Sequence, residues 1–165
     1  MTIVLEADPD TEAGIGRLEL VLGKRLTTAD LSYSMKSERF PCGELSERAL
    51  KYPRDARQAC LALIERHHLD GYTDRVGVLV SELATNAVQH GRADEIRVRL
   101  EIGTEALVLM VRSGSAGEAR RRPPSESEES GRGLWLVEAM ADRYEVSDDG
   151  AWACCAVYLP HEEAS

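Results

Sequence analysis

Apolar side chains recur every three or four positions in two segments of the chain, residues 53–68 and residues 74–90. In the later segment they are Val76, Leu79, Val80, Leu83, Ala84, Ala87 and Val88. In the earlier segment they are Ala56, Ala59, Cys60, Leu63 and Ile64, with His67 on the same stripe. This spacing predicts two helices, each with one buried face. Pro53 is expected to open the first helix, Gly71 to end it in the left-handed conformation, and Thr73 to cap the second.

After residue 95 the pattern changes to the alternation that is typical of a β-strand. Ile96, Val98 and Leu100 alternate with charged residues, which indicates a strand with one solvated face. Residues 106–112 are almost continuously apolar, as in a central strand. We therefore predict an antiparallel hairpin that turns at residues 103–104. Farther along, we predict a helix at residues 131–144 and a closing hairpin at 144–160, with its turn at Asp149 and Gly150.

The stretch between the two predicted hairpins has a different composition. Residues 113–130 are rich in Gly, Pro, Ser and charged residues and show no periodicity, which predicts a long mobile loop. A loop of this length inside a compact domain is usually a lid or a linker. Its arginines, Arg120 to Arg122, either contact a phosphate or an acidic partner, or form a solvated charge run, and we favour the second interpretation.

The predicted order is helix, helix, strand, strand, loop, helix, strand, strand. Helices and strands that segregate in this way are typical of a two-layer α+β sandwich, here with the helices on one face of a mixed, mostly antiparallel sheet. We assign this domain to residues 39–165 and treat residues 1–38 as an N-terminal extension of unclear role. Within the extension, residues 16–26 are compatible with either a strand or a short helix.

Charge and composition narrow the classes of function. The chain has 20 Lys and Arg against 29 Asp and Glu, a net charge of −9, which argues against direct nucleic-acid binding. No apolar run is long enough to span a membrane, and the N-terminus does not have the pattern of a secretory signal, so we expect a cytoplasmic protein. The four cysteines form no CxxC pair, which argues against a zinc site. The adjacent Cys154 and Cys155 are expected on opposite faces of a strand.

Three polar residues interrupt the second predicted helix at intervals of four. Glu82, Asn86 and His90 would line one edge of it, beside the apolar stripe. Asn is a poor residue for a helix interior, whereas its carbonyl oxygen and a carboxylate are suitable ligands for Mg²⁺. Taken alone, this edge is explained better by simple exposure to solvent than by a binding site.

A glycine pair supports the interpretation as a binding site. Gly131 and Gly133 lie at the start of the third predicted helix, directly after the long loop. Glycines allow a close backbone approach to an anion, and the free N–H groups of a helix start attract phosphate. The preceding loop could then close over a nucleotide.

The stretches "SELATNAVQHG", "VLMVRSGSAG" and "SGRGLWLVEAMADRYEV" together resemble the GHKL family of ATPases, which share the Bergerat fold. Within that family the chain is most similar to the anti-sigma-factor serine kinases of actinobacteria. The resemblance covers about residues 39–160. It implies ATP and Mg²⁺ as cofactors. It also implies a sigma factor and a STAS-type anti-anti-sigma protein as partners, and a possible homodimer.

The resemblance also implies a role for each matching residue. Glu82 would be the catalytic base, Asn86 would hold the Mg²⁺, and His90 would line the pocket near the phosphates. The backbone N–H groups at the start of the third helix would bind the phosphates, through Gly131, Arg132, Gly133 and Leu134. The loop at about 113–130 would be the ATP lid. Trp135 lies on the helix that follows the glycines. We expect it in the core and not as a stacking platform.

One motif departs from the family pattern. The Asp that usually receives the adenine amino group is replaced by Ser113, although Gly117 matches a later glycine of that motif. Losing a charge-assisted hydrogen bond costs about 1.5–3 kcal/mol, or roughly 10- to 100-fold in affinity. A Thr expected in the last hairpin has Cys154 as its nearest counterpart. Two hypotheses therefore stay open: a working serine/threonine kinase, and an inactive module that acts only by protein–protein binding.

Overall fold

The computed structural model describes residues 27–36, 44–114, 130–147 and 150–160. Five strands form one sheet in the order β1-β2-β3-β5-β4, and every neighbouring pair is antiparallel. The strands are β1 (Thr27–Lys36), β2 (Glu95–Gly103), β3 (Ala106–Arg112), β4 (Arg143–Val146) and β5 (Trp152–Tyr158). The helices are α2 (Glu47–Arg66), α3 (Thr73–His90) and α4 (Ser130–Met140), with a short 3₁₀ turn, η1 (Asp70–Tyr72).

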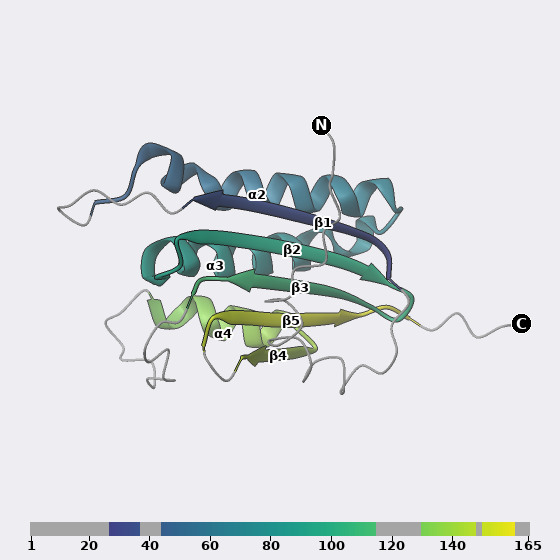
Figure 1. Cartoon of the computed structure of the whole chain (residues 1–165). Coiled ribbons are helices and arrows are strands. Elements are labelled where there is room, and N and C mark those ends of the chain that lie inside the picture. The colour runs from purple at the N-terminus through teal and green to yellow at the C-terminus, as the bar shows by residue number, and fades with distance from the viewer. Residues whose placement is uncertain (1–26, 37–43, 115–129, 148–149, 161–165) are drawn as a thin grey trace, which may run out of the picture.

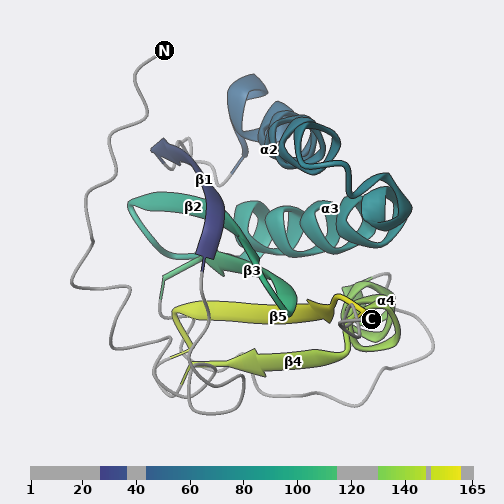
Figure 2. The same cartoon turned by 90° about the vertical axis from the view of Figure 1, so that its right-hand side faces the viewer.

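The three helices lie on one face of the sheet (Figure 1), and the view turned by 90° shows them on the same side of the strands (Figure 2). Helix α3 packs between α2 and α4 and contacts the central strands β2 and β3. The predicted α+β two-layer fold is confirmed. The sheet is antiparallel throughout its described strands, without a parallel pair.

The edge strand β1 comes from a part of the chain that the sequence analysis placed in the N-terminal extension. Thr27 lies opposite Gly103 and Lys36 opposite Glu95, so β1 pairs along the length of β2. Tyr52 on α2 fastens this strand, because its hydroxyl donates to the carbonyl oxygens of Tyr33 (2.8 Å) and Ile96 (3.3 Å). Residues 27–36 are therefore part of the sheet.

Helix α2 begins earlier than predicted, because Ser46 caps it. The Ser46 hydroxyl accepts a hydrogen bond from the Ala49 N–H, which satisfies one of the free donors of the first turn. Pro53 lies inside the helix, beyond the first turn where a proline is expected. The left-handed residue that ends the helix is His68, at φ 57°, and Gly71 is not in that conformation.

The other predicted elements are mostly confirmed. Helix α3 has the predicted length, although Tyr72 occupies its N-cap position without a side-chain hydrogen bond, so the prediction for Thr73 was wrong. The β2–β3 and β4–β5 hairpins are present, and Gly150 takes a positive φ of 71° in the second turn. The third helix was predicted to continue to residue 144, but α4 ends at Met140 and β4 begins at Arg143. No described helix combines the length and the apolar character needed to cross a membrane.

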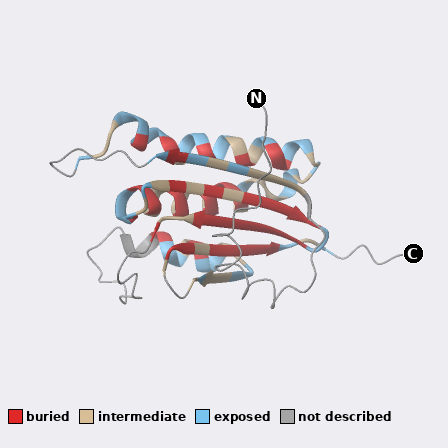
Figure 3. Ribbon diagram, in the orientation of Figure 1, coloured by how far each residue is buried: buried red, intermediate tan, exposed pale blue. Residues whose placement is uncertain are grey.

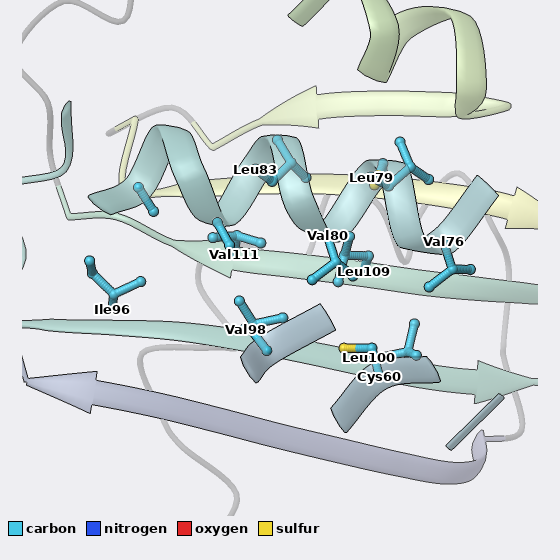
Figure 4. Close-up of a cluster of buried hydrophobic side chains, with 14 of the residues drawn as sticks. Cys60, Val76, Leu79, Val80, Leu83, Ile96, Val98, Leu100, Leu109 and Val111 are labelled. Carbon is cyan, nitrogen blue, oxygen red and sulfur yellow. The ribbon is translucent and has the colours of Figure 1, made fainter. Parts of the chain in front are cut away.

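The main core lies between the helices and the sheet. Figure 4 shows part of this cluster, with Val80 of α3 pointing toward the strands and Cys60 of α2 near Leu100 of β2. Buried positions on β3 and β5 occur on both faces of the sheet (Figure 3). Cys155 belongs to the main core and Cys154 to a second buried cluster, which confirms that these cysteines face opposite ways. The described cysteines, Cys60, Cys154 and Cys155, are free thiols.

Candidate functional site

The polar edge of α3 lies beside the buried face of the helix. Leu83, Ala84 and Ala87 are buried against the core, whereas Glu82 and Asn86 are half-buried and His90 is exposed at the last helical position. The sequence produces this arrangement locally, because positions four apart lie near one another on a helix surface. The partial burial of Glu82 and Asn86 shows that this edge borders other parts of the fold.

Helix α4 supplies the group that borders Glu82. Gly133, in the first turn of α4, is buried, and a Cβ atom built on it would overlap with Oε2 of Glu82. The carboxylate therefore occupies the space that a side chain at position 133 would need. This contact brings the acidic helix motif and the glycine motif together, although they are far apart in the sequence.

The opposite end of α4 is held by Arg75 in the first turn of α3. The Arg75 Nε donates to the Met140 carbonyl oxygen at 2.8 Å, and its guanidinium pairs with the Asp142 carboxylate at 3.1 Å. Asp142 also accepts a hydrogen bond from the Tyr158 N–H on β5, at 2.7 Å. Helix α4 is thus fastened to α3 near both ends, which fixes the position of its N-terminal turn relative to Glu82.

Ser113, at the end of β3, is held by its backbone beside the C-terminal end of α3. Its carbonyl oxygen accepts from the N–H groups of Arg92 and Ala93, both at 2.8 Å, and its own N–H donates to the Ala151 carbonyl at 2.9 Å. The half-buried side chain makes only a long contact, 3.5 Å, with the Gly114 carbonyl. The end of the central strand is therefore a fixed part of the site.

Two glycines that the sequence analysis did not single out make this junction possible. A Cβ on Gly91 would overlap with the Ala87 carbonyl oxygen and come within 2.8 Å of the Ser113 carbonyl oxygen. Gly114 has a positive φ of 77°, and a Cβ there would overlap with Ala93. Each glycine lies next to a predicted site residue, but the backbone approach that requires it is visible only in the folded structure.

Several predicted residues lie elsewhere. Gly117 and residues 115–129 of the predicted lid lie outside the described residues, as do Arg120 to Arg122. The backbone of Gly131 and Arg132 belongs to the first turn of α4, and Leu134 is exposed on that helix. Trp135 is 67% exposed, so the expectation that it belongs to the core was wrong. Cys154 points to the outer face of the sheet, away from the helices, and is not part of this arrangement.

The chemistry of this arrangement fits a nucleotide with a divalent cation. A carboxylate and an amide oxygen lie on α3, and Gly133 brings the start of α4 directly against the Glu82 carboxylate. Among the described residues, no group of three or more His, Cys, Asp or Glu side chains could hold a metal ion. A cation here would therefore depend on few protein ligands, which suits Mg²⁺ because that ion keeps several waters and binds phosphate oxygens.

Residues 47–156 match the model of the histidine kinase-like ATPase domain, which is more than half of the chain. The chain belongs to this family. The match begins at the first residue of α2 and ends within β5, so this ATPase domain includes every predicted site residue. Membership implies that the protein binds ATP, usually with Mg²⁺. Among curated proteins no match to the chain was found.

Proposed function

We propose that this histidine kinase-like ATPase is an ATP- and Mg²⁺-dependent serine/threonine kinase of the anti-sigma-factor type. The observation that carries the proposal is the contact between Glu82 on α3 and Gly133 at the start of α4. It combines a half-buried carboxylate with the free N–H groups of a helix start. A kinase site needs both a group that takes a proton and donors that hold phosphate.

Each residue has a distinct task in this proposal. Asn86, one turn beyond Glu82, would hold the Mg²⁺ through its amide oxygen. The N–H groups of the first turn of α4 would bind phosphate oxygens, and His90 and Ser113 would border the same pocket. When bound, ATP would supply its γ-phosphoryl group and leave as ADP. Glu82 would take the proton from the serine or threonine hydroxyl that receives this group.

We propose protein partners on the basis of the sequence resemblance. The kinase would sequester a sigma factor and phosphorylate a STAS-type anti-anti-sigma protein, so that phosphorylation controls which partner it binds. This activity belongs in the cytoplasm and would not require direct contact with nucleic acid. A homodimer is compatible with it.

A second candidate function rests on Ser113. A serine at this position lacks the carboxylate that would accept a hydrogen bond from the adenine amino group, and a hydroxyl is a weaker acceptor. An inactive member of the family would keep the fold and the partner surface, and would act only by protein–protein binding.

Calorimetric titration with ATP, with and without Mg²⁺, distinguishes these functions. We expect micromolar binding that depends on Mg²⁺ in the natural protein and its loss in Asn86→Ala. Gln89→Ala is the matched control, because Gln89 is an exposed residue of the same helix turn and lies off the polar edge. Binding that is equally strong in Asn86→Ala would refute the site assignment, and the absence of any binding in the natural protein would favour the inactive module.

Phosphoryl transfer is tested separately, with a STAS-type protein and a sigma factor as candidate partners. Phosphoserine or phosphothreonine formed by the natural protein, and lost in Glu82→Gln with ATP binding retained, would support the role of Glu82 as the base. Equal phosphorylation by both proteins would refute that role.

A further inference from the structure

The second face of the sheet, opposite the helices, carries a buried apolar cluster. We call it the outer-face cluster, and it consists of Ala106, Val108, Met110, Ala151, Trp152, Cys154 and Ala156. Met110 and Ala156 are completely buried, and Val108 is only 1% exposed. These residues pair directly across β3 and β5, Met110 with Cys154 and Val108 with Ala156. Figure 3 shows the same two strands as buried along most of their length.

No described element packs on this face. Helices α2, α3 and α4 all lie on the opposite side of the sheet (Figure 2). The outer face of a two-layer sandwich is solvated when nothing lies on it. The burial of the outer-face cluster therefore requires a cover from a part of the chain outside the described residues.

Charged residues next to the cluster are also shielded from solvent: Glu101 is buried, and Arg99 and Asp30 are partly buried. Arg99, opposite Met110 on the same face, pairs with Asp30 at 3.3 Å and with Glu101 at 3.1 Å. Glu101 is only 8% exposed, and the Arg99 Nε is buried without a hydrogen-bond partner. Charged side chains on an open sheet face would stay in water. The burial of Glu101 extends the covered area to β2, and the partial burial of Arg99 and Asp30 shows that solvent is also partly excluded toward β1.

Composition identifies the segment that can provide the cover. Residues 115–129, 148–149 and 161–165 contain no large apolar side chain. Residues 37–43, between β1 and α2 in the sequence, contain one large apolar residue, Phe40. By contrast, residues 1–26 contain nine branched aliphatic residues: Ile3, Val4, Leu5, Ile15, Leu18, Leu20, Val21, Leu22 and Leu26.

The attachment point of this segment favours the same assignment. It joins the sheet at Thr27, opposite Gly103, and therefore at the end of the sheet where β3 begins. Strand β3 lies two strand spacings from β1, about 10 Å away. A few extended residues cover that distance. Leu18, Leu20 and Leu22 alternate with Glu19 and Val21, so an extended segment would turn three leucines toward one side.

We propose that the outer face of the sheet is a docking surface for the protein's own N-terminal segment. Residues 17–22 lie across β3 and β5, and Leu18, Leu20 and Leu22 cover the outer-face cluster. The surface is thereby closed to other proteins, and any protein partner must bind elsewhere. The proposal concerns a face away from the nucleotide site and does not depend on the proposed function.

The cysteines of β5 provide the test. Cys154 lies in the outer-face cluster, whereas Cys155, its neighbour, and Cys60 lie in the main core and serve as internal controls. Alkylation of each thiol in the full chain is followed by peptide mapping. In Leu20→Asp, opening of the cover should raise the alkylation rate of Cys154 by about tenfold or more, with Cys155 and Cys60 unchanged. The matched control Val21→Asp places the same charge on the other side of the segment and should leave Cys154 protected.

An unchanged alkylation rate of Cys154 in Leu20→Asp, or an equal rise of that rate in Val21→Asp, would overturn the proposal.

Disulfide trapping is a second test that does not depend on weakening the cover. Cys substitutions at positions 18, 20 and 22, in a Cys42→Ser background, should give at least one disulfide to Cys154 on mild oxidation. Glu19→Cys and Val21→Cys should give none. Failure of all three leucine positions to trap Cys154 would also overturn the proposal.

Discussion

Gly133 of α4 lies directly against the carboxylate of Glu82 on α3, with no space for a side chain between them. This relationship joins the two motifs that carry the proposed chemistry. It also gives the glycine a role besides phosphate binding, because the missing side chain sets the position of the proposed base. A side chain added at Gly133 should therefore affect nucleotide binding more than it affects stability.

Gly133→Ala should weaken ATP binding by about tenfold, which corresponds to about 1.4 kcal/mol. The new methyl group must displace the Glu82 carboxylate or shift the first turn of α4. The free energy of unfolding should fall little, because the overlapping atom is the end of a flexible side chain and Ala is favoured over Gly in helices by about 1 kcal/mol. Calorimetric titration and thermal unfolding measure the two effects. The control is Gly71→Ala, where a Cβ meets no atom within 4 Å, and equal ATP affinity in the two variants would contradict the prediction.

Ser113→Asp should strengthen ATP binding by roughly 10- to 100-fold, since a carboxylate accepts a stronger hydrogen bond from the adenine amino group, about 1.5–3 kcal/mol. The backbone of Ser113 is held by hydrogen bonds to Arg92, Ala93 and Ala151, so the substitution should not move the strand. Titration with ATP, and with GTP as a comparison, measures the gain and its base specificity. Ser113→Ala is the matched control, with unchanged or weaker binding. Lower affinity in Ser113→Asp would mean that the alignment of this strand end with the family motif is wrong.

Gly91→Ala should lower the free energy of unfolding by about 1–3 kcal/mol, the range for overpacking a well-packed position. A Cβ at this position overlaps with backbone carbonyl oxygens of Ala87 and Ser113, which cannot rotate away. Denaturant unfolding gives the value, with Gly71→Ala again as a control that should be near neutral. An unchanged free energy of unfolding in Gly91→Ala would show that the end of α3 and the end of β3 are not closely packed.

The free energy of unfolding should fall steeply above about pH 9. Burial raises the pKa of Cys60 to about 12 and also raises the pKa values of Cys155 and Tyr52. Each group is therefore protonated in the folded state at a pH where the unfolded chain has released its proton. The stabilisation is complete below the unfolded pKa and is lost as pH rises through the folded pKa, at up to about 1.4 kcal/mol per pH unit for each group.

Urea unfolding at pH 7 to 11 measures this dependence. Cys60→Ala is the informative variant, because it removes one of the three groups. It should lower stability at neutral pH through lost packing, and should show a shallower decline with pH above 9. Parallel curves for the two proteins would rule out a contribution from Cys60.

Sequence patterns alone predicted the elements from α3 to β5 and the antiparallel pairing within the β2–β3 and β4–β5 hairpins, but a mixed sheet was expected and every described pair is antiparallel. Such predictions succeed because the period of the apolar positions is a local property: residues 74–90 repeat every three or four positions, and residues 96–101 every two. The opposite orientation of Cys154 and Cys155 follows from the same rule. The start of α2 was misplaced because Pro53 suggested a helix start, whereas the cap is provided by Ser46.

The sequence by itself determined that the proposed site residues Glu82, Asn86 and His90 lie along one edge of α3, because positions four apart share an edge of any helix that contains them. Only the tertiary structure decided what lies against that edge. The contact of Gly133 with Glu82 and the junction of Gly91 with Ser113 join residues of different elements, and their fit depends on the packing of α3 against α4 and β3. The placement of Trp135 on the surface was decided in the same way. Periodicity shows that a helix has a buried face, but the neighbouring elements determine which side chains that face includes.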